Sequence, residues 1–170
     1  MTAPTGVLAE RVVGELADLA RALGRLEAHA AAGTSDGLTA PDEPSGEQWD
    51  AGQVWAHLAE FGSFWLPELR RIVDARSSEP VPFGRTKRDA ERIGAIERNC
   101  HLAIDQQMSI VRGDIAHFAH ELALLDAADW ERTGRHPTLG DMDLFVFLRH
   151  FVTGHYHEHA DQLDGLRGER

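Results

Sequence analysis

The sequence predicts an all-α fold, a four-helix bundle, on three observations. Apolar residues recur at steps of three and four along long segments, which is the spacing of one helical face. No stretch shows apolar–polar alternation bounded by turns, the pattern of a strand. The chain has 170 residues, of which 42% are apolar, and this suffices for one core. We therefore expect residues 1–170 to form a single domain.

The first two helices are expected over about residues 5–31 and from Asp50 to about residue 76. Residues 33–46 between them are rich in Gly, Pro and Ser and are predicted to form a loop. Asp50 is a suitable N-cap for the second helix, and Pro67 should kink that helix or remove one of its hydrogen bonds. The inward stripes are Leu8, Val12, Leu16, Leu19, Leu23 and Leu26 in the first helix and Val54, Leu58, Phe61, Trp65, Leu69, Ile72 and Val73 in the second.

The third region should divide into a short helix near residues 87–98 and a long one over about 100–125. Its inward residues are expected to be Leu102, Ile110, Ile115, Phe118, Leu122 and Leu125. Residues 126–141 read as a loop, and Asp141 can cap a fourth helix that runs to about Leu166. Four amphipathic helices without a sheet favour a bundle, whose core commonly holds metal sites.

Two histidines in the fourth helix form the strongest functional signal. His155 and His159 are four residues apart, so they project from one helical face, the face that also carries the apolar stripe. Such a pair can bind a transition metal if another ligand is supplied. His57 borders the inward stripe of the second helix and is the candidate third ligand, although spacing alone cannot connect it to the others. The alternative is that all three are core histidines bonded to carbonyl or carboxylate groups.

Three imidazoles with an open position suit a catalytic divalent metal, with zinc or nickel as the expected ions. Gln162 lies one turn beyond His159 and could support a ligand, while an interface or capping amide is its other interpretation. We expect no catalytic residue beyond the metal site. Cys100 lies away from these motifs, and no glycine-rich loop suggests a nucleotide cofactor.

Composition argues against several classes of partner. The net charge of −11 disfavours binding to nucleic acid or to an anionic membrane surface. A single cysteine excludes an internal disulfide, no apolar run approaches the length of a membrane span, and the N-terminus lacks signal-peptide features. The expected location is therefore the cytoplasm, and the expected partner is a small-molecule substrate.

The same motifs resemble those of the DinB/YfiT-like superfamily. The resemblance is carried by Gln48-Trp49 followed by Val54-x-x-His57-Leu58, by Asp129-Trp130, by His136-Pro-Thr-Leu-Gly140, and by His155-x-x-x-His159-x-x-Gln162-Leu163. It implies a four-helix bundle of the DinB/YfiT type, often dimeric, in which a histidine triad holds a divalent metal. Matched position by position, that triad is His57, His155 and His159.

The resemblance also suggests a reaction. Some relatives are metal-dependent transferases or isomerases that use low-molecular-weight thiols such as mycothiol, bacillithiol or glutathione. We therefore expect a metal-dependent enzyme, a homodimer, that transfers mycothiol or a similar thiol to an electrophilic substrate. The alternative is a non-catalytic metal-binding or dimerisation module with a role in stress. In such a module a fourth protein ligand would complete the coordination of the metal and leave no open position.

Overall fold

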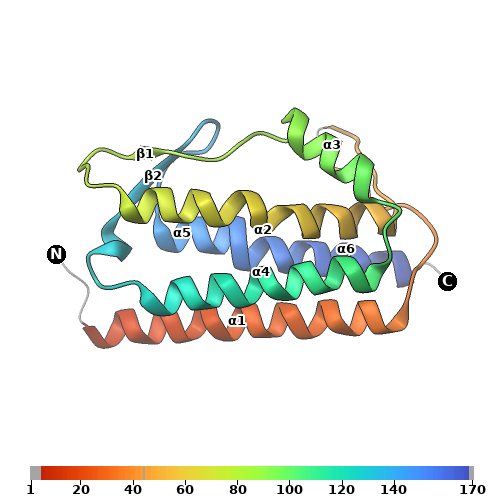
Figure 1. The fold of residues 1–170 in the computed structure, drawn as a ribbon, viewed down its shortest axis with the longest axis horizontal. Helices are drawn as coiled ribbons and strands as arrows, with labels where there is room; N and C mark the ends of the chain where they lie inside the picture. Colours follow the sequence, from red (N-terminus) through yellow and green to blue (C-terminus); the bar gives the residue numbers. More distant parts are fainter. Residues whose placement is uncertain (1–4, 44, 169–170) are drawn as a thin grey trace.

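The computed structural model describes residues 5–43 and 45–168. Four long helical segments run side by side (Figure 1) and confirm the predicted four-helix bundle. They are α1 (Thr5–Ala32), α2 (Ala51–Asp74), α4 (Ile104–Leu124) and the segment formed by α5 (Leu144–Leu148) and α6 (Gly154–Gly168). Both α1 and α2 pack against α4 and α6, so these two consecutive helices occupy opposite corners of the bundle.

Helix α2 begins as the sequence predicts. The Asp50 side chain accepts a hydrogen bond from the Gln53 backbone N–H, and the Gln53 side chain accepts one from the Asp50 N–H, which completes a capping box. Pro67 lies inside the helix and removes one backbone donor there. The inward stripe is buried from Val54 to Ile72, and it forms one side of the core.

The third region differs in detail from the prediction. Helix α3 (Ala90–Asn99) is capped by Asp89 and packs on the outside of α2, and α4 starts only at Ile104. Two residues expected inside are exposed. Leu102 precedes α4 and is 37% exposed, and Ile110 is 48% exposed because the buried face of α4 runs through Met108 and Val111 instead. Ile115, Phe118 and Leu122 are buried as predicted, while Leu125 is only partly buried.

A small sheet occupies part of the predicted loop 126–141, which is a correction to the expectation of no strands. It contains β1 (Val81–Pro82), β2 (Thr133–His136) and β3 (Gly140–Asp143), with β1 parallel to β2 and β2 antiparallel to β3. A short 3₁₀ turn, Asp129–Glu131, precedes it. The strands have no apolar alternation because β2 packs through its backbone: a Cβ on Gly134 would lie 2.5 Å from the Phe83 ring.

The fourth helical segment is interrupted rather than continuous. Asp143, not Asp141, caps α5, because Asp141 belongs to β3. A π-helical turn, Arg149–Thr153, separates α5 from α6, and the Gly154 N–H donates to the Arg149 carbonyl five residues earlier. A Cβ at Gly154 would lie 2.1 Å from that oxygen, so the turn requires glycine there. This single wider turn sets the direction in which α6 presents its side chains.

No helix within residues 5–43 and 45–168 is long and apolar enough to cross a membrane.

Candidate metal centre

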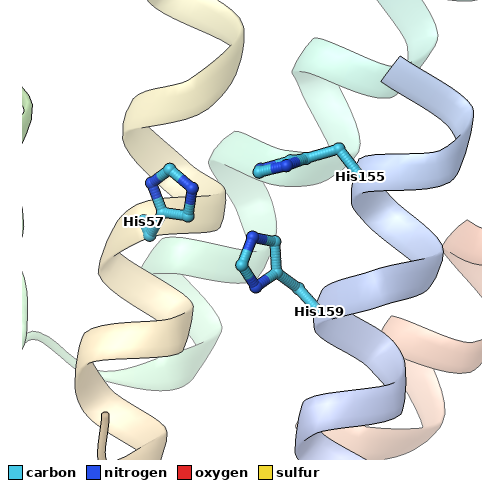
Figure 2. A group of neighbouring side chains, drawn as sticks. All are labelled: His57, His155 and His159. Atoms are coloured by element: carbon cyan, nitrogen blue, oxygen red, sulfur yellow. The ribbon is translucent and has the colours of Figure 1, made fainter. Parts of the chain in front are cut away.

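The structure brings the three predicted histidines together in the interior of the bundle. One nitrogen from each of His57, His155 and His159 lies within 4.8 Å of the others. The ring centroids are 4.9 Å apart for His57–His155, 4.8 Å for His57–His159 and 4.2 Å for His155–His159. Figure 2 shows the rings turned toward one another, His57 from α2 and the other two from successive turns of α6. We call this group the histidine cluster.

Hydrogen bonds fix which nitrogens remain free. The Nδ1–H of His57 donates to Oε1 of Glu60 at 2.7 Å, and the Nδ1–H of His159 donates to Oε1 of Gln162 at 2.7 Å. Each bond leaves the Nε2 lone pair without a proton. Nε2 of His155 is buried and has no hydrogen-bond partner among the described residues. The cluster therefore offers the Nε2 lone pairs of His57 and His159 beside the unpartnered Nε2 of His155, and Gln162 has the supporting role that the sequence allowed.

Burial keeps these imidazoles neutral. Loss of solvent lowers the pKa of His57 and of His155 well below the usual value, and the neighbouring histidines lower both further. Burial also lowers the pKa of His159 to about 4, although its bond to Gln162 acts in the opposite direction. At neutral pH all three rings are therefore in the form that binds a metal, and no proton has to leave first.

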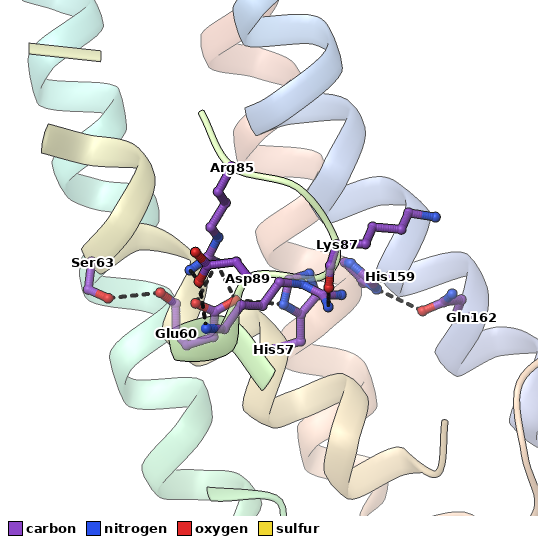
Figure 3. A network of polar contacts seen from close by, with 9 residues as sticks. His57, Glu60, Ser63, Arg85, Lys87, Asp89, His159 and Gln162 are labelled. Atoms are coloured by element: carbon purple, nitrogen blue, oxygen red, sulfur yellow. Dashed lines mark hydrogen bonds and ion pairs between the residues drawn. The ribbon is translucent and has the colours of Figure 1, made fainter. Parts of the chain in front are cut away.

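A chain of buried charges holds His57 in position. Glu60 is 9% exposed and accepts bonds from the Arg85 guanidinium at 2.7 and 2.6 Å in addition to the bond from His57. Figure 3 shows this network, in which Arg85 reaches Glu60 from the loop before α3. Burial raises the pKa of Glu60 and Arg85 opposes the rise. A carboxylate behind a histidine ligand orients the ring and makes it more basic.

Trp49 lies against the same cluster. Its ring contacts His57 edge-on at 5.1 Å and stacks on His159 at 6.0 Å. The residue is held by Thr39, whose hydroxyl oxygen accepts from the Trp49 N–H at 2.9 Å and whose own N–H donates to the Trp49 carbonyl at 2.8 Å. These two hydrogen bonds to Thr39, one to its side chain and one from its backbone, position the indole just before the α2 cap. The Gln48-Trp49 motif is therefore part of the wall of the site.

A cavity of about 680 Å³ opens onto the cluster. Its apolar wall includes Phe61, which stacks on His155 at 3.9 Å, and Trp65, which stacks on Phe151 at 4.5 Å. His136 of β2 also lines it, with Nδ1 accepting from the Thr138 and Leu139 N–H groups at 3.3 Å each. The space accommodates a small molecule beside the three free nitrogens.

Several of these residues were not predicted. Glu60 follows His57 by three residues, so helical spacing alone could have identified it. Arg85 and Arg92 come from the loop before α3 and from α3 itself, and His136 comes from the unpredicted hairpin. No local pattern connects Arg85 or Arg92 to the histidines; only the fold does. His136 belongs to a motif that carries the family resemblance, but no role in the site was predicted for it.

Comparisons with known proteins agree with this architecture. A comparison with curated proteins finds no significant match. Among solved structures, the chain is similar to YfiT from Bacillus subtilis, described as a probable metal-dependent hydrolase with an unusual four-helix bundle topology. The TM-score is 0.72 at 18% sequence identity, and the match covers 94% of this chain and 87% of that one. At this identity the match shows a similar fold. A model of the DinB superfamily matches residues 17–163. On this match, which spans most of its length, the chain belongs to the DinB superfamily.

Proposed function

We propose that this chain is a metal-dependent enzyme that transfers a low-molecular-weight thiol to an electrophilic substrate. The observation that supports it most is the histidine cluster, whose three neutral imidazoles lie beside a cavity of about 680 Å³. His57, His155 and His159 would hold the metal, with zinc or nickel as the expected ion and mycothiol or a similar molecule as the thiol.

The residues present suit a divalent metal. Imidazole nitrogen is a good ligand for zinc and nickel, and a buried nitrogen such as Nε2 of His155 is costly unless something binds it. A divalent metal bound there would supply positive charge that favours the thiolate form of a bound thiol near neutral pH. Within residues 5–43 and 45–168, no fourth His, Cys, Asp or Glu joins the cluster. This favours a metal with an open coordination position. It disfavours the alternative, a non-catalytic module in which four protein ligands surround the metal.

The chain's own residues would bind and position the reactants. Phe61 and Trp65 offer apolar surface to the electrophile and exclude water, while Glu60 and Gln162 keep the rings of His57 and His159 in place. The lone Cys100 is absent from the cavity lining, and its Sγ–H donates to the Glu97 carbonyl. A reacting thiol at this site would therefore be that of an exogenous molecule.

Metal content tests whether the histidine cluster binds a divalent metal. We expect near-stoichiometric zinc or nickel in the purified protein by elemental analysis, lost in His155→Ala. The matched control is His157→Ala, because His157 lies on the same helix but contacts Arg25 instead of the cluster. Retained metal in His155→Ala, or no metal in wild type after reconstitution, would overturn the assignment of the site.

A thiol-transfer assay tests whether the metal-loaded protein is a thiol transferase. The metal-loaded protein is incubated with monochlorobimane and a panel of thiols that includes mycothiol, bacillithiol and glutathione, and product fluorescence is followed. We expect turnover with at least one thiol in wild type and His157→Ala, and none in His57→Ala. If the metal-loaded protein uses no thiol, the transferase assignment is wrong. In a parallel assay with an ester and no thiol, cleavage by the same protein would instead support hydrolysis.

A further inference from the structure

One basic residue in the cavity wall differs from the rest. Four arginine and lysine side chains line the cavity. Three of them have a carboxylate partner: Arg85–Glu60 at 2.6 Å, Lys87–Asp42 at 2.7 Å and Arg149–Glu15 at 3.2 Å. The fourth, Arg92, forms no ion pair with any of the described residues, yet it is only 8% exposed. Burial lowers the pKa of Arg92, and the charges of Glu47, Glu60 and Asp42 offset this only in part because none of them contacts it. A buried cation without a contacting anion is costly, so its retention calls for an explanation.

The contacts of Arg92 hold the side chain but leave most of its donors free. Its Nη1 donates to the Lys87 carbonyl at 3.0 Å, and its Cζ lies 5.1 Å from the centre of the Trp49 ring. A guanidinium has five N–H donors, so one backbone carbonyl and one aromatic ring do not satisfy it. The remaining donors are available to a molecule in the cavity that Arg92 lines.

Arg92 also lies near the histidine cluster. The indole of Trp49 that contacts Arg92 is the one that contacts His57 and His159. In agreement with this, the charge of Arg92 contributes to the lowered pKa of all three histidines. A small molecule bound at the cluster therefore lies within the field of an unpaired guanidinium.

We infer that Arg92 binds a carboxylate of the small molecule that binds at the histidine cluster. This rests on the proposed function and narrows it: the thiol or its electrophile carries a carboxylate. The planar fork of a guanidinium matches a carboxylate in two parallel hydrogen bonds. Glu47 and Glu158 also line the cavity, and their charges disfavour a dianionic group such as a phosphate.

Cobalt-substituted protein offers a test that does not depend on turnover. The probes are mercaptoacetate, 3-mercaptopropionate and 4-mercaptobutyrate, each compared with the mercapto-alcohol of the same length. Thiolate binding is followed by the charge-transfer absorption of cobalt(II). We expect at least one acid to bind wild type about 10- to 100-fold more tightly than its alcohol. In Arg92→Gln this preference should be lost while affinity for the alcohol is kept.

The matched control is Lys87→Gln, which removes one positive charge from the same wall but from an exposed side chain that pairs with Asp42. It should keep the preference for the acid. No preference in wild type, an undiminished preference in Arg92→Gln, or an equal loss in Lys87→Gln would overturn the inference. Loss of alcohol binding in Arg92→Gln would assign Arg92 a structural role instead. Failure to take up cobalt would refute the metal site itself, whereas cobalt uptake without a preference refutes only the role of Arg92.

Discussion

Replacement of Glu60 by glutamine is expected to weaken metal binding although Glu60 is not itself a ligand. Its carboxylate accepts three hydrogen bonds, one from His57 and two from Arg85. An amide of the same shape accepts through one oxygen only, so its NH₂ group would face either the His57 Nδ1–H or the Arg85 guanidinium. In either arrangement a donor faces a donor, and His57 loses its anionic partner.

The size of the effect follows from these contacts. Loss of a partner behind a histidine ligand typically reduces metal affinity by about 10- to 100-fold, which corresponds to about 1.4–2.7 kcal/mol. The metal-free protein should also lose stability, because the Arg85 side chain is only 9% exposed and its charge would no longer be balanced. Breaking a buried ion pair in this way costs about 3–5 kcal/mol, here reduced by Asp89 at 3.9 Å.

The zinc dissociation constant is measured by competition with a chromophoric chelator, and stability by urea unfolding of the metal-free protein. Glu68→Gln is the matched control. Glu68 is a glutamate of the same helix, 8% exposed, whose carboxylate accepts from the Gly84 N–H and from Arg71 and does not contact a histidine. This control should lose some stability and keep the zinc affinity of wild type. Wild-type zinc affinity in Glu60→Gln, alongside lost binding in His57→Ala, would refute the reasoning.

Three further predictions concern stability. Burial raises the pKa of Asp114 to about 6, so stability is lost as pH rises from about 4 to about 6. Asp114→Asn should therefore add about 1–2 kcal/mol at pH 7.5, allowing for partial exposure, and almost nothing at pH 4. An equal gain at both pH values would count against this. Gly52→Ala should cost about 1–3 kcal/mol in urea unfolding, because its Cβ would lie 2.2 Å from the Cys100 carbonyl oxygen, whereas Gly113→Ala, which meets nothing within 4 Å, should not destabilise. The metal-free protein should lose stability as pH falls from about 6.5 toward 4, because unfolded His57, His155 and His159 take up protons that the folded form refuses. The share of His159 is up to about 1.4 kcal/mol per pH unit, so His159→Gln should show a shallower slope, and an unchanged slope would contradict this.

Helix α2 could be predicted well because it has a continuous apolar stripe and a readable start at the Asp50 cap. The start of α4 could not be read in this way, because its N-cap Ala103 makes no side-chain hydrogen bond. His155 and His159 could be paired because spacing within one helix determines direction. Arg85 and Arg92 could not be assigned, since their approach to the cluster depends on how the loop before α3 crosses α2. The hairpin was missed because backbone pairing and a glycine contact, not alternation, stabilise it.

Other expectations remain predictions. Zinc or nickel as the metal, and mycothiol or a similar molecule as the thiol, stay predictions. A homodimer depends on a second copy, and the sequence contributes only its apolar surface residues to that question. The experiments on metal content and thiol transfer address the first two, and measurement of the molecular mass in solution addresses the third.

The π-helical turn before α6 holds one residue more than a regular helical turn. Each residue of an α-helix advances the side-chain direction by about 100°, so an extra residue in a regular helix would rotate all of α6. The wide turn absorbs that residue, and His155 and His159 remain directed toward His57. A related chain that lacks one residue between Arg149 and Thr153 should therefore form a regular helix there and keep both histidines in place. Within the turn, buried Val152 and Thr153 should vary less than exposed His150.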